Sequence, residues 1–206
     1  MMQFPNARIV LFAKAPEAGK VKTRLLPVVS AEEAAELYAE LLKQTVEKMV
    51  RAKLAPLECW CSPDTSHPIF QSLVDDFGIT LRLQQGADLG IRMERAAGET
   101  LTEVQSLVLI GGDCPALEPH HLSQAFGWLE GGVDAVVGPA EDGGYVLLGL
   151  KENSRLLFSD MPWGGNQVLR LTRERLQQLN WCSRELETLW DLDRPTDLER
   201  YRLLRE

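Results

Sequence analysis

Two kinds of hydrophobic pattern alternate along the first two thirds of the chain. Short, almost continuously apolar runs are typical of strands buried on both faces of a sheet, and they lie at residues 7–14, 56–62, 79–84 and 106–113. Segments with apolar residues three or four positions apart predict helices, and they lie at residues 30–53, 69–78, 89–104 and 118–130. This alternation predicts a mainly parallel sheet with helices on both faces.

The last third of the chain continues the pattern with one change. Residues 133–150 form two apolar runs around an acidic, glycine-rich loop, which predicts two strands. A helix is expected over residues 166–179, a late strand over 185–193, and a closing helix over 195–206 with Pro195 in its first turn. A chain of 206 residues without repeats or linkers predicts a single domain.

Composition and charge exclude several classes of protein. A net charge of -8 argues against a nucleic-acid-binding protein, because such binding depends on Lys and Arg side chains that neutralise phosphates. No apolar run approaches the roughly 20 residues that cross a bilayer, so we expect no membrane partner and a cytoplasmic location. The four cysteines and three histidines show no zinc-ligand spacing, which favours buried free thiols.

The loop after the first strand is basic within an acidic protein. Lys14, Lys20, Lys22 and Arg24 face only one carboxylate there, that of Glu17. Cations and the free N–H groups of a glycine-containing turn both favour a bound phosphate. Gly19 and Lys20 are followed by Val21, so the loop is not a Walker loop, and a solvated basic loop is the alternative.

Two further loops carry carboxylates at the predicted ends of strands. Asp113 follows Gly111 and Gly112, and it can hold Mg²⁺ or Mn²⁺ together with water and substrate phosphates, or act as a turn residue. Asp142 precedes Gly143 and Gly144, a sequence that is also typical of a hairpin turn. If this loop lies near the other two, Asp142 can orient or deprotonate an acceptor hydroxyl.

The fourth candidate segment is WDLDRPTDL near the C-terminus. Asp191 and Asp193 share one face if the segment is extended, and Asp193 can supply a second carboxylate to the metal. The alternative is that Asp193 and Asp197 favour the start of the last helix, where negative charge stabilises the helix by about 0.3–1 kcal/mol.

Five motifs in order, FAKAPEAGKVKTRL, GGDCP, GPAEDGGYVLLGL, MPW and DLDRPTDL, resemble those of a known transferase family. They are similar to the radical-SAM/selenodomain-associated transferases, which are related to 2-phospholactate guanylyltransferase. The resemblance implies a three-layer α/β/α GT-A fold, that of the nucleotide-diphospho-sugar transferases, with a mainly parallel central sheet. Within the domain it implies a nucleotide-binding part over about 1–115 and an acceptor part over about 116–206.

The resemblance also implies roles for individual residues. Those of the basic loop that would contact phosphates are Lys14, Gly19, Lys22 and Arg24. Asp113 would be the metal and catalytic aspartate, and Asp193 a second ligand. The segment QQGADLGIRM also matches, and this match would place near the nucleotide or the substrate Gln85, Gly86, Leu89, Gly90 and Arg92. Gly143 and Gly144 would approach the substrate, and Trp163 would be a platform for a sugar or acceptor, with core packing as its alternative.

Two departures from the family pattern are present. The aspartate pair of glycosyltransferases is reduced to one aspartate in GGD, and Arg194 replaces the threonine of the closing Asp-x-Asp-Thr-Pro pattern, which weakens the helix cap. The expected function is metal-dependent transfer of a sugar from a nucleotide sugar to a small-molecule acceptor. Nucleotidyl transfer from an NTP, with release of pyrophosphate, is the close alternative, and a catalytically silent nucleotide sensor is a third. The sequence leaves the number of subunits open.

Overall fold

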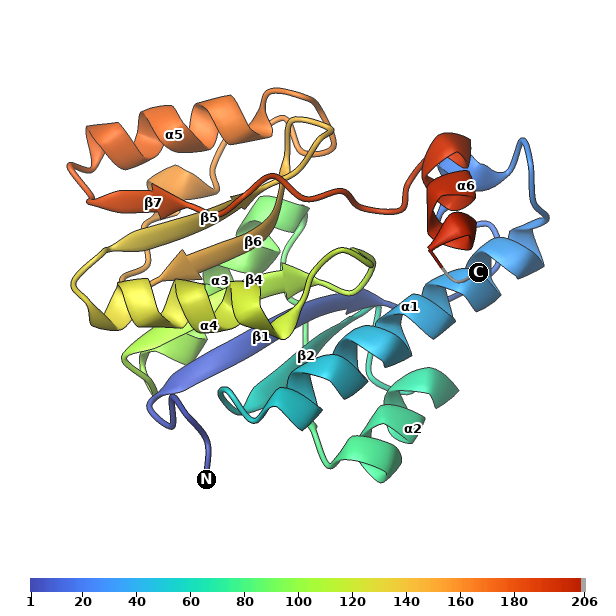
Figure 1. The fold of residues 1–206 in the computed structure, drawn as a ribbon, viewed down its shortest axis with the longest axis horizontal. Coiled ribbons are helices and arrows are strands. Elements are labelled where there is room, and N and C mark those ends of the chain that lie inside the picture. The colour runs from blue at the N-terminus through green and yellow to red at the C-terminus, as the bar shows by residue number, and fades with distance from the viewer. Residues whose placement is uncertain (205–206) are drawn as a thin grey trace.

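A computed structural model describes residues 1–204, and it contains one seven-stranded sheet (Figure 1). The strands of this sheet are β1 (Ala7–Lys14), β2 (Leu57–Ser62), β3 (Thr80–Leu83), β4 (Ser106–Gly111), β5 (Ala135–Pro139), β6 (Tyr145–Leu150) and β7 (Ser183–Glu185). Their order across the sheet is β3-β2-β1-β4-β6-β5-β7. All neighbours pair in parallel except β6, which runs antiparallel to β4 and β5. The mainly parallel sheet is confirmed.

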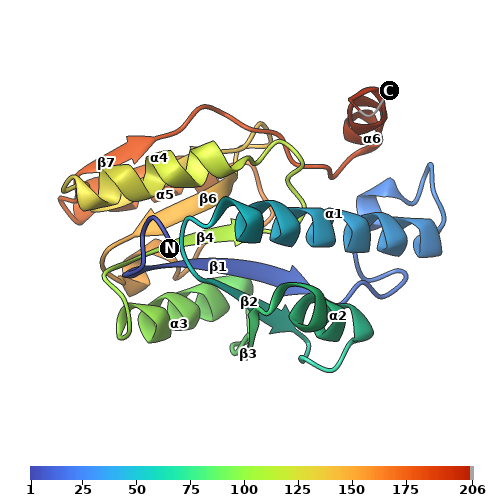
Figure 2. The ribbon, with the colours of Figure 1, turned by 60° about the horizontal axis from the view of Figure 1, so that its bottom comes forward.

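Helices connect the strands and cover both faces of the sheet. They are α1 (Ala31–Ala52), α2 (Pro68–Phe77), α3 (Leu89–Leu101), α4 (Pro119–Glu130), α5 (Val168–Gln178) and α6 (Pro195–Leu203), with two short 3-10 helices, η1 (Thr23–Leu25) and η2 (Arg155–Leu157). Residues of α1, α2 and α4 pack with Ile9 and Leu11 of β1 in one core, and residues of α3 and α5 pack with Val10 in a second core. Figure 2 shows α1 and α4 on one side of the sheet and α3 on the other. The three-layer α/β/α architecture is therefore confirmed.

Local sequence signals explain where the elements begin. The hydroxyl of Ser30 accepts a hydrogen bond from the backbone N–H of Glu33, and the Glu33 carboxylate accepts one from the N–H of Ser30. This capping box starts α1 at the position that the sequence predicts. Cys59 and Cys61 lie on the same face of β2 and are buried free thiols, as their spacing indicated. No helix in the range 1–204 has the length and apolar character of a bilayer span.

The predicted strand over residues 185–193 is wrong for most of its length. β7 covers Ser183–Glu185, and beyond it only one isolated bridge, between Ala140 and Leu189, continues the pairing. The remaining residues run as an extended connection to α6, which packs against the first half of α1 (Figure 1). This connection is anchored by side chains that pack with Leu41 of α1, because Trp190 and Leu192 are both buried there. Of the predicted closing helix, residues 205–206 lie outside the described part.

The strand directions bring three loops to one edge of the sheet. β1 and β4 are parallel, so the loops after Lys14 and after Gly111 leave from the same edge. β6 is antiparallel to β4, and Leu147, near its start, pairs with Ile110, near the end of β4. The loop between β5 and β6 therefore reaches the same edge, which is where parallel α/β sheets bind ligands.

Candidate active site

The basic loop and the loop after β4 meet at a buried ion pair. The Nζ atom of Lys22 donates a hydrogen bond to Oδ2 of Asp113 at 2.7 Å and a second one to the carbonyl oxygen of Leu192. The Lys22 side chain is only 3% exposed, whereas that of Asp113 is 36% exposed. Lys22 also has a left-handed backbone, with φ at 48°, which is uncommon for a residue other than glycine. The predicted proximity of these loops is thus present, and one lysine joins three segments.

The glycines before Asp113 permit close packing. A Cβ atom at Gly112 would lie 2.7 Å from Cδ1 of Leu42 in α1, and one at Gly111 would lie 3.0 Å from Oδ1 of Asp113. A larger residue at Gly112 would displace the Leu42 side chain, and one at Gly111 would press on the Asp113 carboxylate. These two glycines let the end of β4 pack closely against α1. The carboxylate of Asp113, which follows them, contacts Lys22.

A second ion pair closes the site from the C-terminal segment. The guanidinium of Arg24 donates to Oδ2 of Asp193, and its other terminal nitrogen donates to the carbonyl of Gly164 at 3.5 Å. The hydrogen bond to Asp193 raises the pKa of Arg24. The backbone N–H of Leu192 donates to the carbonyl of Asp113 at 3.2 Å, so the segment that carries Asp193 is also held by the loop of Asp113.

These loops surround a polar cavity of about 440 Å³, here called the basic cavity. Its charged lining residues are Lys14, Lys20, Lys22, Arg24, Asp113 and Asp193. Thr23, Gln84 and the buried Tyr38 complete the polar lining, and the Tyr38 hydroxyl accepts a hydrogen bond from the Lys14 backbone N–H at 3.0 Å. Four cations from one loop with two carboxylates from two others form a surface suited to phosphates.

A second cavity of about 240 Å³ adjoins the first, and it is here called the apolar cavity. It shares Phe12 and Leu89 with the basic cavity. Its carboxylates are Asp142 and Asp191. Its other large lining side chains are apolar or aromatic: Met93, Leu109, Ile110, Tyr145, Val146, Trp163 and Val168. The two cavities together form a cleft along the carboxyl edge of the sheet.

Asp191 occupies an unfavourable position for a negative charge. Its burial raises its pKa to about 6, and the nearby carboxylates of Asp113 and Asp142 add to this shift. Asp193, two residues further on, instead contacts Arg24 in the basic cavity. The two aspartates of DLD therefore line different cavities, instead of sharing one face as an extended segment would predict.

Asp142 both stabilises its turn and lines the apolar cavity. Its Oδ1 atom accepts a hydrogen bond from the N–H of Gly144 at 2.8 Å, so it stabilises the turn between β5 and β6. Gly143 has φ at 88°, and a Cβ atom there would lie 2.4 Å from the carbonyl oxygen of Asn166. The predicted hairpin is confirmed, and Asp142 and Gly144 also line the apolar cavity.

Trp163 is a wall of the apolar cavity held by close packing from behind. Its ring lies edge-to-face with that of Tyr145, with centroids 6.3 Å apart and an angle of 86° between the planes. Behind it, a Cβ atom at Gly90 would lie 2.6 Å from Nε1 of Trp163 and 2.4 Å from the carbonyl oxygen of Phe158. Gly90 therefore supports Trp163 and does not itself line either cavity.

Gly90→Ala is expected to destabilise the fold by about 1–3 kcal/mol, because the added methyl group meets a backbone carbonyl and the Trp163 ring. Gly127→Ala in α4 is the matched control, since a Cβ atom there meets nothing within 4 Å. This control should stabilise by about 0.5–1 kcal/mol, the usual effect of alanine in a helix. Urea unfolding measures both changes, and equal effects of the two substitutions would contradict the packing role of Gly90.

The rest of the segment predicted to approach the nucleotide has other contacts. Arg92 donates from Nε to the Gly86 carbonyl at 3.0 Å and from a terminal nitrogen to Oγ of Ser62 at 3.1 Å, which ties the start of α3 to the end of β2. Neither cavity is lined by Gln85, Gly86 or Arg92. The neighbouring Gln84 lines the basic cavity, and its amide donates to the carbonyls of Ala13 and Trp60. Gly19 provides a left-handed turn, with φ at 75°, before the cationic residues.

Sequence reasoning missed most of the apolar lining. Phe12 and Leu89 line both cavities; Leu89 belongs to the segment that the resemblance places near the nucleotide or the substrate, whereas Phe12 is part of an ordinary apolar pattern in β1. Leu89 is 42% exposed, which is unusual for a large apolar side chain and becomes visible only in the structure.

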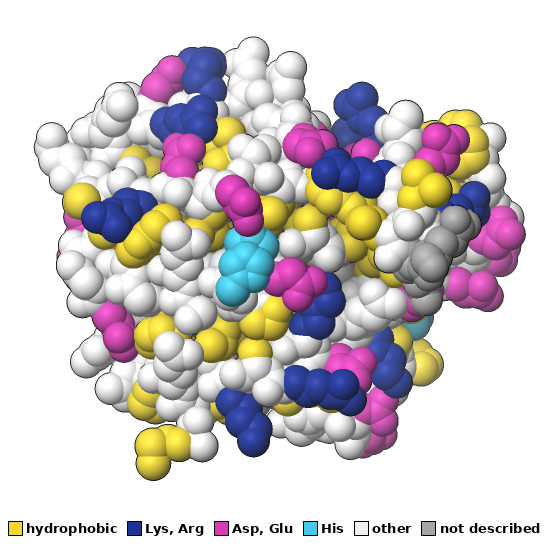
Figure 3. All heavy atoms as spheres, viewed as in Figure 1, with side chains coloured by type: hydrophobic (Ala, Val, Ile, Leu, Met, Phe, Trp, Pro, Cys, Tyr) yellow, Lys and Arg dark blue, Asp and Glu magenta, His cyan; other side chains and the backbone are white. Residues whose placement is uncertain are grey.

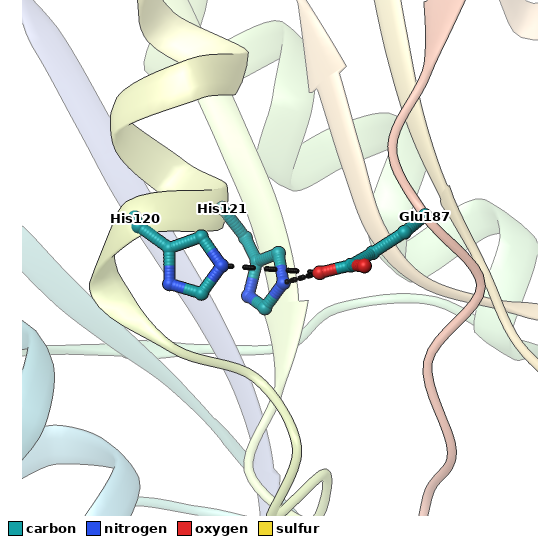
Figure 4. Close-up of side chains that lie close together, drawn as sticks. All are labelled: His120, His121 and Glu187. Atoms are coloured by element: carbon teal, nitrogen blue, oxygen red, sulfur yellow. Dashed lines mark hydrogen bonds and ion pairs between the residues drawn. The ribbon is translucent and has the colours of Figure 1, made fainter.

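A separate histidine cluster lies in the first turn of α4, where His121 is buried and His120 is exposed (Figure 4). Nε2 of His121 lies 3.0 Å from Oε1 of Glu187, and Nε2 of His120 lies 3.9 Å from the same oxygen. Nδ1 of His121 accepts a hydrogen bond from the backbone N–H of Glu118, so the neutral ring carries its proton on Nε2 and donates it to Glu187. That tautomer leaves no lone pair on Nε2 for a metal, and the cluster is explained as the cap of α4. In Figure 3 the histidines, in cyan, lie among acidic and basic side chains on this face.

Comparison with known proteins identifies the fold and the family. A candidate nucleotide-diphospho-sugar transferase from Desulfovibrio desulfuricans G20 is 30% identical, with a TM-score of 0.86 over 96% of this chain and 86% of that one. The seven-stranded sheet is thus the fold of nucleotide-diphospho-sugar transferases. The model of a family of uncharacterized proteins conserved in bacteria, DUF2064, matches residues 45–165, and the chain belongs to this family.

Two more distant structures share the fold alone. CMP:2-keto-3-deoxy-manno-octonic acid synthetase in complex with CTP is 13% identical, with a TM-score of 0.60 over 97% of this chain and 98% of that one. The 4-diphosphocytidyl-2C-methyl-D-erythritol synthase of Anaerococcus prevotii DSM 20548 is 7% identical, with a TM-score of 0.61 over 98% and 99%. No curated protein is significantly similar in sequence.

Proposed function

We propose that this protein is a metal-dependent transferase that uses a nucleotide-diphosphate donor, and that it transfers a sugar from a nucleotide sugar to a small-molecule acceptor. The observation that carries the proposal is the meeting of Lys22 and Asp113, from two separate loops, in one cavity that also contains Arg24. The 30% identical relative, described as a candidate nucleotide-diphospho-sugar transferase, supports the same class of donor.

The residues of the basic cavity fit a hard divalent cation such as Mg²⁺ or Mn²⁺. Asp113 and Asp193 both line this cavity and offer the oxygen ligands that these ions prefer. In the described chain, neither Asp113 nor Asp193 belongs to a cluster of three His, Cys, Asp or Glu residues whose ligand atoms lie within 4.8 Å of one another. Proteins usually bind Mg²⁺ through one or two carboxylates, and water and substrate phosphates fill the remaining coordination positions. A cation bound there would neutralise charge that develops on the leaving diphosphate.

The protein's own residues divide the remaining work between the two cavities. Lys22 and Arg24 hold the diphosphate by charge-assisted hydrogen bonds, and both are oriented by carboxylates before substrate arrives. Asp142 accepts the proton of the acceptor hydroxyl while the oxygen of that hydroxyl forms a bond to the sugar carbon. The bond between that carbon and the diphosphate oxygen breaks, and the electron pair leaves with the diphosphate. Phe12 and Leu89, which border both cavities, limit the entry of water.

Asp113→Asn is the substitution that tests this function. Asparagine keeps an oxygen acceptor for Lys22 but removes the charge that a metal requires, so transfer should fall by about 100-fold or more. Incubation of the protein with Mn²⁺ and a panel of nucleotide sugars should release nucleoside diphosphate. Asp75→Asn, on the exposed side of α2, is the control and should leave the rate unchanged. Full activity of Asp113→Asn would refute the assignment.

Nucleotidyl transfer is the second candidate function. It is supported by the fold that this chain shares with the CTP-bound synthetase and the diphosphocytidyl synthase. The same cavity would then hold an NTP, and the bond between the α- and β-phosphates would break. A pyrophosphate assay with each NTP and a phosphorylated acid distinguishes the two reactions. Release of pyrophosphate without release of nucleoside diphosphate from sugar donors would select this candidate. Tight nucleotide binding without turnover in either assay would indicate the catalytically silent sensor.

A further inference from the structure

The two halves of the cleft differ in the sign of their charge. The basic cavity is lined by four cations and two carboxylates. The apolar cavity is lined by the carboxylates of Asp142 and Asp191, and among residues 1–204 no Lys, Arg or His lines it. Lys22 and Arg24 act on these carboxylates from the basic cavity. Inside the apolar cavity itself, a phosphate or carboxylate would face two like charges.

The lining of the apolar cavity favours a ring-shaped molecule. Phe12, Tyr145 and Trp163 contribute aromatic rings, and Met93 and Val168 add aliphatic surface. Aromatic walls favour both flat rings and cations, since the faces of aromatic rings attract positive charge. In the described chain the Asp191 carboxylate makes no ion pair, and it is hydrogen-bonded only by its own backbone N–H, so it keeps lone pairs that can accept a hydrogen bond from a ligand.

The apolar cavity is also placed to hold the second substrate. It meets the basic cavity at Phe12 and Leu89, so a molecule inside it can contact a donor whose diphosphate lies beside Lys22 and Arg24. Arg24 of the basic cavity also donates to the carbonyl of Gly164, a residue that lines the apolar cavity. The volume of about 240 Å³ suits a compact ring with a short substituent.

We propose that the apolar cavity is the acceptor site, and that the acceptor is a small molecule with an apolar ring and a hydroxyl or amino group, not a phosphorylated or carboxylated acid. The carboxylates of Asp142 and Asp191 receive its hydrogen bonds, and Trp163 and Tyr145 contact its ring. The acceptor role rests on the proposed function, whereas the charge selectivity of the cavity can be measured by itself.

Three probes of one shape test the charge selectivity: phenethylamine, 2-phenylethanol and phenylacetate. They are titrated into protein with ¹⁵N-labelled tryptophan at about pH 8, where carboxylates are ionised and an alkylamine is protonated. The indole N–H signal of Trp163, assigned with Trp163→Phe, reports binding. Phenethylamine and 2-phenylethanol should shift this signal, and phenylacetate should bind at least about tenfold more weakly. Equal or tighter binding of phenylacetate would overturn the proposal.

Charge substitutions show whether the two aspartates cause the selectivity. In Asp142→Asn with Asp191→Asn, the preference for phenethylamine over phenylacetate should shrink to about twofold or less. Glu141→Gln is the matched control, because Glu141 adjoins Asp142 but pairs with Arg200 and does not line the cavity. The control should keep the wild-type ratio. If the ratio of phenethylamine to phenylacetate affinity is unchanged in the double variant, or in Asp142→Asn alone, the proposal is contradicted.

The nucleobase of the donor is the rival occupant of the apolar cavity. Uridine, cytidine, adenosine and guanosine, which carry no phosphate, are therefore tested for displacement of phenethylamine. Displacement by any of them at similar concentration would overturn the acceptor assignment, and its absence supports it. Nucleoside diphosphate binding is measured separately. If no nucleotide binds but the probes rank as expected, the proposed function and the acceptor role fail, and the charge selectivity of the cavity stands. If nucleotides bind and the probe order reverses, only this inference fails.

Discussion

Lys22→Met is expected to weaken the binding of a nucleoside diphosphate by about 100-fold. Lys22 is the buried cation of the basic cavity, and its ammonium group holds both Asp113 and the Leu192 carbonyl. A hydrogen bond to a charged group contributes roughly 1.5–3 kcal/mol, which corresponds to about 10–100-fold in affinity. Methionine also leaves the Asp113 carboxylate without its partner, which adds repulsion toward the phosphates.

Lys20→Met provides a matched control within the same loop. Lys20 lines the same cavity and has the same charge, but its side chain is 70% exposed and pairs only with Glu17. Exposed pairs of this kind contribute roughly 0–1 kcal/mol, so the control should lose less than about fivefold. Isothermal titration of each variant with the nucleoside diphosphate that binds the wild type best, in the presence of Mn²⁺, measures both effects. Equal losses would show that overall loop charge, and not the buried lysine, governs binding.

Asp191→Asn is expected to stabilise the ligand-free fold at neutral pH while it impairs function. Burial, with added repulsion from Asp113 and Asp142, raises the pKa of Asp191 to about 6 from a usual value of 3.8. A shift of this size means that the charged form of Asp191 lowers the free energy of unfolding by at most roughly 3 kcal/mol. Asparagine removes this cost, so the melting temperature should rise by about 4–8 °C for a gain of about 2 kcal/mol.

The sign of the pH dependence follows from the raised pKa. The neutral carboxyl is favoured in the folded state, so its contribution to stability is fully present below about pH 4 and is lost as pH rises through about 6. The advantage of Asp191→Asn should therefore be small near pH 4 and complete above about pH 7. Thermal unfolding over this range tests it, with Asp75→Asn as an exposed control that changes stability by less than about 0.5 kcal/mol. A destabilised variant at neutral pH would contradict the account.

Local signals allowed much of the fold to be predicted. Continuous apolar runs identified the strands, the capping box at Ser30 placed the start of α1, and Asp142 with its glycines indicated the β5–β6 hairpin. The approach of Lys22 to Asp113 was also predictable, because both follow parallel strands whose carboxyl ends share an edge.

The C-terminal contribution to the site was harder to predict. Lys22 and Leu192, like Arg24 and Asp193, are about 170 residues apart, and no periodicity encodes such contacts. The predicted strand over 185–193 failed because the segment pairs with the sheet at Leu189 and then departs to bury Trp190 and Leu192 against α1. Its aspartates consequently face two cavities, and Asp191 acquires its burial from tertiary packing.

The account depends on a metal-bound diphosphate between the basic loop and Asp113, and paramagnetic broadening by Mn²⁺ tests this most directly. Backbone amide signals of ¹⁵N-labelled protein are recorded with a nucleoside diphosphate, with and without Mn²⁺. We predict that broadening is strongest for residues 20–24 and 112–114 and requires the nucleotide. Broadening centred on His120 and Glu187, or no localised broadening with nucleotide present, would contradict the proposed site.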